Sequence, residues 1–376
     1  MNIAVDIRCL MTKERTGVAV YTFELLDALF KVDTQNSYYL FYNSHKDVDQ
    51  FLPTWDYKHV HFVKYAWPNK LLNMCMWLLK YPKLDTLISK KVDKRIDYFF
   101  SPNIHFLALS KQVKHILTIH DLSYELFTEC YSKKRRLWHA LINPKKQCER
   151  ANIIVCPSER TRLDVIAHFN ISKEKVHTVY SGIPRKAPSN IEGVKTLYSL
   201  PQHFVLFVGT LEPRKNIIAA IKAFVSRKQV LDAGYECIIA GPRGWHDKEI
   251  LDLIDQYKQV RYIGYVDDSE KQSLYGLADA FVFPSIYEGF GFPVLEAMRA
   301  GTPVITSDRS ALPEVVGDAA YVVNPLDINA IGLAIERVLD EENLRNMFIE
   351  KGTWRSSVFI WKKTAQQFIS LYENRN

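Results

Sequence analysis

Short apolar runs alternate with longer, helix-compatible segments along the whole chain, and no other feature constrains its fold as strongly. Strands that alternate with helix-length segments are typical of parallel sheets covered by helices. The strand candidates of the first half are Ile3–Ile7, Tyr38–Phe41, Val60–Val63, Tyr98–Phe100, Ile116–Ile119, Ile153–Cys156 and Val176–Tyr180. Those of the second half are Phe204–Val208, Glu236–Ala240, Val260–Ile263, Ala280–Phe283, Pro303–Thr306 and Tyr321–Val323. The pattern predicts an α/β protein in which each half forms its own sheet.

The chain length and a polar stretch near its middle predict two domains. A chain of 376 residues is too long for one ordinary hydrophobic core. The stretch from Pro184 to Leu200 is polar and lacks a clear period, so it is interpreted as a linker. The predicted domains are residues 1–185 and residues 186–356. An amphipathic helix is predicted over 357–376, because apolar residues recur there at helical spacing. They are Phe359, Trp361, Ala365, Phe368, Ile369 and Tyr372.

Cysteine spacing and the N-terminal sequence bear on the compartment. None of the six cysteines forms a C-x-x-C pair, so metal clusters and redox motifs lack support. Cys9, Cys156 and Cys237 lie in or near apolar runs and are interpreted as buried thiols of a reducing compartment. We expect no signal peptide, because Met1 leads directly into a strand candidate. No apolar run is long enough to span a bilayer. These features predict a cytoplasmic protein.

Positive charge is concentrated in the first half. Residues 1–185 hold 28 Lys and Arg against 18 Asp and Glu, a net of +10, and the remainder holds 21 against 24, a net of −3. Between Lys58 and Arg95 there are nine basic residues and two acidic ones. Apolar residues interleave with them, namely Trp67, Leu71, Leu72, Met74, Met76, Trp77, Leu78 and Leu79. Two interpretations stay open: contact with an anionic membrane, or a core helix with a solvated basic face. No nucleic-acid motif accompanies the charge, so nucleic acid is not expected as a partner.

One run in the second half combines glycines, a proline and two glutamates. Residues 284–297 read Pro-Ser-Ile-Tyr-Glu-Gly-Phe-Gly-Phe-Pro-Val-Leu-Glu-Ala, between a strand candidate and a predicted helix over 294–300. Gly289 and Gly291 let backbone N–H groups approach an anion at a helix N-terminus. Pro293 suits a first helical turn. The carboxylates of Glu288 and Glu296 suit sugar hydroxyls, so the run predicts a nucleotide-sugar site.

A second run follows the first strand candidate of the same half. Residues 207–216 read Phe-Val-Gly-Thr-Leu-Glu-Pro-Arg-Lys-Asn, and a helix is expected to begin near Ile217. Gly209 ends the strand, and Arg214 and Lys215 lie at the turn. These two cations can clamp a diphosphate, with Arg supplying a fork of donors and Lys a point charge.

Two loops of the first half also carry candidate residues. His120 and Asp121 follow a strand candidate, where side chains face the crevice in which ligands bind. His120 can hydrogen-bond a sugar hydroxyl or stabilise developing charge. Asp121 can orient His120 or cap the turn that follows. Gly17 lies after the first strand and can bring backbone close to a ligand.

These runs resemble the retaining glycosyltransferase family 4. Glu288 and Glu296 have the spacing of its E-x7-E signature, and residues 209–216 have the form seen in many bacterial surface-polysaccharide transferases of this family. The resemblance covers the second half well and the first half loosely. It implies the GT-B fold: two Rossmann-like domains facing each other across a cleft, with a C-terminal helix crossing back to the N-terminal domain. Residues 1–185 would then bind the acceptor and residues 186–356 the nucleotide-sugar donor.

The resemblance also implies roles for single residues. Lys215, Glu288 and His120 would act in catalysis, with Lys215 at the diphosphate, Glu288 at sugar hydroxyls and His120 by the donor sugar. The implied substrate-binding residues are Gly17, Asp121, Gly209, Arg214, Val266, Gly289, Phe290, Gly291, Phe292, Val294, Leu295 and Glu296. Glu296 would accept hydrogen bonds from the ribose hydroxyls. Thr210 stands where the family often has arginine, and whether Arg214 replaces that arginine is left open. Relatives need no metal, so neither a metal nor a cofactor is expected.

The implied reaction is hexosyl transfer with retention, from GDP-mannose to a saccharide acceptor that is lipid-linked, in O-antigen or other surface-polysaccharide synthesis. The enzyme would be cytoplasmic, with peripheral contact to the membrane. Rhamnosyl or other hexosyl transfer from a dTDP- or UDP-sugar is the alternative within the class. A GT-B nucleotide-sugar epimerase is the alternative outside it. A Rossmann oxidoreductase would need Gly-x-Gly-x-x-Gly after the first strand, and the chain has only Gly17 there.

Overall fold

The computed structural model describes residues 1–13, 16–184, 190–245 and 247–373. Its contacts divide the chain into two compact units. The first unit is Met1–Leu122, Lys133–Gly182 and Ile360–Asn376, and the second is Ser123–Ser132 and Ile183–Phe359. The chain therefore contributes a short segment of its first half to the second unit. The predicted boundary between residues 185 and 186 lies outside the described residues.

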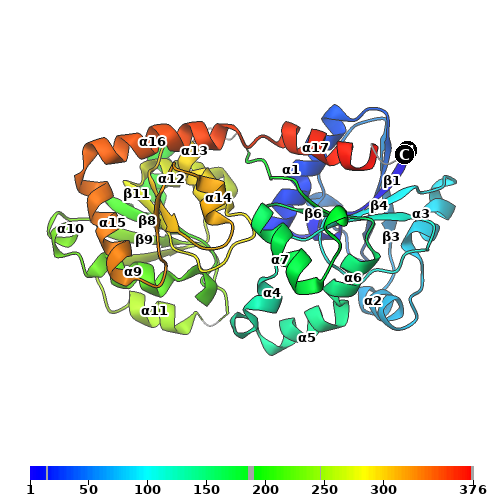
Figure 1. The fold of residues 1–376 in the computed structure, drawn as a ribbon, viewed down its shortest axis with the longest axis horizontal. Coiled ribbons are helices and arrows are strands. Elements are labelled where there is room, and N and C mark those ends of the chain that lie inside the picture. Colours follow the sequence, from blue (N-terminus) through cyan, green and yellow to red (C-terminus); the bar gives the residue numbers. More distant parts are fainter. Residues whose placement is uncertain (14–15, 185–189, 246, 374–376) are drawn as a thin grey trace. The chain divides into compact units, whose positions relative to one another are not determined.

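The first unit contains a seven-stranded parallel sheet with strand order β3-β2-β1-β4-β5-β6-β7 (Figure 1). Its strands are β1 (Asn2–Asp6), β2 (Ser37–Asn43), β3 (Val60–Tyr65), β4 (Tyr98–Ser101), β5 (Lys114–Thr118), β6 (Ile153–Cys156) and β7 (Val176–Thr178). Each overlaps a predicted strand. Strands such as β1, β2, β4 and β6 are buried almost throughout, and a strand buried on both faces reads as a continuous apolar run.

Helices cover this sheet. They are α1 (Gly17–Val32), α2 (Asn69–Leu78), α3 (Leu84–Val92), α5 (Lys133–Ile142), α6 (Pro144–Arg150), α7 (Glu159–Phe169) and α17 (Trp361–Glu373), with short 3₁₀ turns at Arg8–Leu10, Asp49–Phe51 and Lys173–Lys175. The last helix, α17, begins at Trp361 and packs against α1 of the first unit. The ring of Phe368 lies 4.6 Å from that of Phe100, and the hydroxyls of Tyr372 and Tyr38 are 3.2 Å apart.

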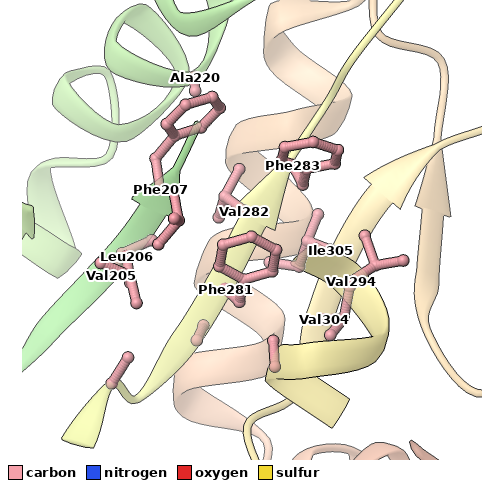
Figure 2. Close-up of a cluster of buried hydrophobic side chains, with 14 of the residues drawn as sticks. Val205, Leu206, Phe207, Ala220, Phe281, Val282, Phe283, Val294, Val304 and Ile305 are labelled. Atoms are coloured by element: carbon pink, nitrogen blue, oxygen red, sulfur yellow. The ribbon is translucent and has the colours of Figure 1, made fainter. Parts of the chain in front are cut away.

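The second unit contains a six-stranded parallel sheet with strand order β10-β9-β8-β11-β12-β13. Its strands are β8 (Phe204–Val208), β9 (Glu236–Ala240), β10 (Val260–Gly264), β11 (Ala280–Phe283), β12 (Val304–Ser307) and β13 (Tyr321–Val323). Figure 2 shows apolar side chains of β8, β11 and β12 packed in its core, and the rings of Phe207 and Phe283 stack 5.8 Å apart.

The helices of the second unit are α4 (Ser123–Leu126), α8 (Ile191–Leu197), α9 (Ile217–Val225), α10 (Lys228–Asp232), α11 (Lys248–Ile254), α12 (Asp268–Leu277), α13 (Phe292–Arg299), α14 (Leu312–Val316), α15 (Ile328–Asp340) and α16 (Glu342–Ser357), with 3₁₀ turns at Thr128–Cys130 and Pro213–Lys215. Helix α8 lies in the stretch predicted as a linker. The side chain of Asn190 caps it by accepting a hydrogen bond from the backbone N–H of Gly193 at 3.1 Å. Among the helices of the described ranges, none combines the length and apolarity needed to cross a membrane.

Candidate active site

The two motif runs of the second half meet at the centre of the second unit's sheet. Strands β8 and β11 are hydrogen-bonded neighbours, and the strand order reverses between them, with β9 and β10 on one side and β12 and β13 on the other. In open parallel sheets, ligands bind beyond the carboxyl ends of the strands at such a switch point. The loop after β8 carries Arg214 and Lys215, and the loop after β11 carries Glu288.

Lys215 and Glu288 form a buried ion pair. The Nζ of Lys215 lies 2.6 Å from Oε1 of Glu288, and both side chains are about nine-tenths buried, with exposures of 11% and 10%. The same ammonium lies 4.9 Å from the ring centroid of Phe283, at the end of β11. A charge held over an aromatic face and against a carboxylate is fixed in position before any ligand arrives.

Arg214 adds a second cation to this pair. Its guanidinium lies 2.6 Å from a carboxylate oxygen of Glu212 and 3.4 Å from Oε2 of Glu288. It also donates a hydrogen bond to the carbonyl of Tyr287. Two cations and two carboxylates therefore form one network between the loops after β8 and β11. The sequence did not single out Glu212, although it stands two residues before Arg214.

The charges of this network keep Glu288 ionised. Burial by itself raises the pKa of Glu288, but the charges of Lys215 and Arg214 and the hydrogen bond from Lys215 outweigh burial and hold the pKa below its ordinary value. An ionised carboxylate only accepts hydrogen bonds. Glu288 can therefore orient hydroxyl groups at neutral pH but has no proton to give.

Close backbone packing shapes the loop after β8. Gly241 has φ +138°, and a Cβ at this position would lie 2.1 Å from the carbonyl oxygen of Gly209. The N–H of Gly209 in turn donates to the carbonyl of Ala240 at 2.9 Å. Only a residue without a side chain fits at Gly241. This contact fixes the course of the chain from β8 toward Lys215.

Helix α13 begins directly behind this network. Gly291 precedes it with φ +100°, and a Cβ there would lie 2.7 Å from Cδ2 of Leu312. The side chains of Phe290, Val294 and Leu295 are buried in the core, so only main-chain atoms at these positions can face a ligand. Figure 2 shows Val294 pointing toward the sheet. The helix N-terminus adds a partial positive charge near the two cations.

The remaining predicted residues of this unit lie on neighbouring elements. Glu296 lies on α13 and accepts a hydrogen bond from the hydroxyl of Tyr275 at 3.1 Å. Val266 follows β10 and its side chain is buried, so it too can offer a ligand only its backbone. Gly289 and Phe292 lie beside Glu288 and Gly291 in the same loop and helix start. The structure thus brings the second-half candidates to one edge of one sheet.

His120, Asp121 and Gly17 belong to the first unit. The Nε2 of His120 lies 2.8 Å from the carbonyl oxygen of Pro102, and the ring packs edge-on against Tyr21 with centroids 4.7 Å apart. Burial lowers the pKa of His120, although the Pro102 carbonyl and the charge of Asp121 oppose it. The ring is therefore neutral at pH 7, with Nε2–H donating and Nδ1 left as an acceptor. Gly17 is the first residue of α1.

Aromatic residues of the segment 123–132 also pack on the second unit. The ring of Phe127 lies 5.3 Å from that of Tyr287, next to Glu288, and the ring of Tyr131 lies 5.4 Å from that of Trp245. Sequence reasoning missed this segment, because its partners lie more than a hundred residues away. Across the described ranges, no group of three or more His, Cys, Asp and Glu residues is arranged to hold a metal ion.

Comparison with known families accounts for both units. Residues 15–186 match the family described as Glycosyltransferase Family 4, and residues 195–355 match Glycosyl transferases group 1. The chain belongs to glycosyltransferase family 4. It is therefore an enzyme that transfers sugars, and its relatives place it among the hexosyltransferases.

Two relatives of the glycosyltransferase are mannosyltransferases by name. It is 33% identical to O-antigen chain mannosyltransferase B of Escherichia coli over 287 residues, which cover 74% of each chain. It is 32% identical to the serotype-specific mannosyltransferase WbdA of Escherichia coli over 67% of its own length. That match covers 32% of the longer WbdA chain.

Solved structures of low sequence identity share the GT-B fold of this glycosyltransferase. Sucrose-phosphate synthase of Thermosynechococcus elongatus matches with a TM-score of 0.73 at 19% identity, over 99% of this chain and 98% of that one. HepE of Anabaena, solved with UDP-glucose, matches with a TM-score of 0.72 at 17% identity over the full length of both chains. WaaG, a glycosyltransferase of lipopolysaccharide biosynthesis, matches with a TM-score of 0.69 at 15% identity, over 98% of this chain and 99% of WaaG.

Proposed function

We propose that the enzyme transfers mannose from GDP-mannose, with retention of anomeric configuration, to a lipid-linked saccharide during O-antigen or related surface-polysaccharide synthesis. The likeness to O-antigen chain mannosyltransferase B supports the sugar and the pathway class. The observation that carries the chemistry is the buried Lys215–Glu288 pair at the switch point of the second unit. In this pair a cation that can bind phosphate lies beside a carboxylate that can accept hydrogen bonds from sugar hydroxyls.

The donor would lie along the edge formed by the loops after β8 and β11. Lys215 and Arg214 would bind the diphosphate together with the N-terminal end of α13, and Glu296 would accept hydrogen bonds from the ribose. Glu288 would then exchange part of its ion pair for hydroxyl groups of the sugar. The presence of UDP-glucose in the related HepE structure supports a nucleotide-sugar donor.

In the proposed reaction the bond between the sugar C1 and the β-phosphate oxygen breaks as the bond from C1 to the acceptor oxygen forms. The acceptor hydroxyl approaches from the face that the diphosphate leaves, and its proton passes to the departing diphosphate. The barrier falls mainly because charge develops on a leaving group held by preorganised cations. His120, neutral through burial, would contribute hydrogen bonding rather than a proton.

We further propose that the reaction needs no metal ion or cofactor, because Lys215, Arg214 and the helix N-terminus can supply the positive charge that a metal would provide. The acceptor would bind to the first unit, at the cytoplasmic face of the membrane. The alternative donor is a UDP- or dTDP-sugar, and the HepE complex with UDP-glucose supports the UDP-sugar of the two. An epimerase of the same fold would change the sugar nucleotide without any acceptor.

A thermal-shift panel of GDP, UDP, dTDP and ADP with their sugar nucleotides tests the donor. Binding to the native state alone raises stability by about 2.7 kcal/mol at a hundredfold excess over the dissociation constant. We expect GDP and GDP-mannose to raise the melting temperature selectively. A selective UDP or dTDP shift would move the donor to another sugar. Product NMR then tests retention, and a changed sugar nucleotide formed without acceptor would support the epimerase.

The variant Glu288→Gln tests the role of the carboxylate. It keeps the shape of the side chain and removes the charge, so transfer should fall strongly while GDP still raises the melting temperature. Near-normal turnover by this variant would contradict the role of Glu288 at the sugar.

A further inference from the structure

Helix α2 of the first unit and the three residues after it expose a group of large apolar side chains. The α2 face is defined here as Leu71, Met74, Trp77, Leu78, Leu79 and Tyr81. Exposure reaches 57% at Leu78 and 70% at Leu79. Single exposed apolar residues are ordinary, but six within eleven residues are a local concentration of exposed apolar surface that water disfavours. Such a concentration marks a surface that binds something apolar.

The fold does not need this face for its own core. Leu72 and Met76 lie one turn apart on α2 and are buried among the apolar side chains of the first unit. Leu71, Met74 and Leu78 follow the spacing i, i+3, i+7 and therefore lie along a different face of the same helix. One face anchors the helix to the unit, and another presents apolar groups to solvent.

Exposed basic side chains accompany the α2 face along the chain. Lys70 lies in α2 and Lys80 two residues after its end, and exposed cations follow in and after α3, namely Lys90, Lys91, Lys94 and Arg95. Of the two acidic residues between 58 and 95, Asp93 is exposed, whereas Asp85 is buried and accepts a hydrogen bond from the N–H of Ser110 at 2.8 Å. The exposed side chains of this stretch are thus large apolar groups together with an excess of cations.

Helix α5 adds further exposed positive charge to the same unit. It begins with four exposed cations, Lys133, Lys134, Arg135 and Arg136. Segment 105–109 contacts both α5 and the core on which α2 packs. On the α5 side, the ring of Trp138 lies 6.4 Å from that of Phe106. On the α2 side, Ala108 and Leu109 belong to the same buried cluster as Leu72 and Met76. In Figure 1 both helices lie along the lower side of the first unit.

We propose that the α2 face docks onto an anionic lipid bilayer. Its apolar side chains enter the headgroup layer, and the lysines and arginines of α2, α3 and α5 contact lipid phosphates. Lysine is depleted at protein–protein interfaces, whereas apolar side chains rimmed by Lys and Arg are typical of helices that lie in a membrane surface. Each cation near such a surface adds attraction to anionic lipids. The charge pattern therefore favours a lipid surface over a protein partner.

This inference rests on the proposed function in one respect: the lipid-linked acceptor would be the reason for the enzyme to bind a membrane. The test uses the full chain and vesicles without donor or acceptor, so each proposal can fail alone. One set of vesicles is phosphatidylcholine, and the other is an equal mixture of phosphatidylcholine and phosphatidylglycerol. We expect co-sedimentation with the anionic vesicles, little with the neutral ones, and release at high salt.

The variants Leu78→Glu and Leu79→Glu test the α2 face directly. Loss of a leucine contact and addition of a negative charge should weaken partitioning by at least about tenfold each. The matched control is Leu326→Glu in the second unit, where the leucine has the same 70% exposure as Leu79. All three positions are exposed, so the variants should fold, and each should transfer sugar to a soluble acceptor analogue at the wild-type rate.

Three results would overturn the proposal. The wild-type protein could fail to sediment with anionic vesicles, which would leave a protein partner for the α2 face. The two α2 variants could bind vesicles as well as the wild type. The control Leu326→Glu could lose vesicle binding to the same extent. An added negative charge anywhere on the chain would then weaken vesicle binding, and the α2 face would have no special part in it.

Discussion

Each unit places a buried ion pair where its strand order reverses, but the two pairs are built differently. In the first unit, Asp6 ends β1, and the Nε of Arg8 donates to its carboxylate at 2.8 Å from two residues away. In the second unit, Lys215 and Glu288 are 73 residues apart in sequence and meet at 2.6 Å. The two partners of the first pair lie within one turn of the chain, whereas the second pair joins the loops that follow two neighbouring strands.

The sheets themselves do not explain this difference, because β8 to β13 repeat the order of β1 to β6. In both units burial raises the pKa of the carboxylate and the neighbouring cations bring it below its ordinary value, so Asp6 and Glu288 are both ionised at pH 7. Arg8 also donates to the carbonyl of Phe106 at 3.1 Å, which ties the local pair to the loop after β4. We infer that the local pair holds its unit together, while the long-range pair can exchange partners with a ligand.

The largest expected effect is that of Lys215→Ala. Loss of the cation at the leaving group should lower kcat/KM for the sugar nucleotide by about 10²–10³-fold, as removal of a preorganised charge stabiliser does in other enzymes. Initial rates and calorimetric donor binding measure it. Lys222→Ala, at an exposed lysine of the neighbouring α9, is the control and should change neither. An unchanged donor dissociation constant in Lys215→Ala would remove this residue from the diphosphate site.

Arg8→Ala should act on stability instead. It leaves the buried carboxylate of Asp6 without its partner, and such a change costs roughly 3–5 kcal/mol in the free energy of unfolding. Denaturant unfolding measures the loss, and donor affinity should stay at the wild-type value. If the variant does not fold, Arg8→Lys keeps the charge and should show a smaller loss. Weaker donor binding in a folded Arg8 variant would break the comparison between the two pairs.

Gly291→Ala should destabilise the start of α13. The residue has φ +100°, and its new Cβ would press on Leu312, so we expect a loss of about 3 kcal/mol in the free energy of unfolding. The control is Gly234→Ala, where φ is +83° and no atom lies within 4 Å of the added Cβ, so the cost should be about 1 kcal/mol. Equal losses of stability in the two variants would show that the backbone conformation alone sets the cost and that the contact with Leu312 adds nothing to it.

The smallest expected effect is that of EDTA. If Lys215 and Arg214 supply the positive charge at the leaving group, chelation should change the transfer rate by less than about twofold, because no metal acts as Lewis acid. Initial rates with and without EDTA measure it. If EDTA abolishes activity and Mg²⁺ restores it, the charges of Lys215 and Arg214 in the second unit do not suffice to stabilise the leaving group.

Much of the fold could be predicted because buried parallel strands are visible as apolar runs. The predictions Phe204–Val208 and Ala280–Phe283 coincide with β8 and β11. Helix α8 was missed because it is short and contains Gly193, and its capping residue Asn190 was its only signal. The predicted last helix begins at Trp361, whereas Phe359 precedes it and packs against Phe290 of the second unit.

The candidate site was predictable as far as its residues share local motifs. The glycines and charges around Lys215 and Glu288 stand in two recognisable runs, so both were identified. Their mutual contact was not, because a 73-residue separation carries no local signal. The same reason hides the contacts of Arg214 with Tyr287 and of Phe127 with the same tyrosine.

The position of α17 has a consequence for how the chain acquires its structure during translation. The N-terminal unit is built from Met1 onward, yet its helix α17 supplies Phe368 and Tyr372 to the core beside Phe100, Tyr98 and Tyr38. A ribosome must therefore synthesise the whole second unit before the first can close its core. Domains usually fold in the order in which they are made. In this chain the unit that emerges first is completed last.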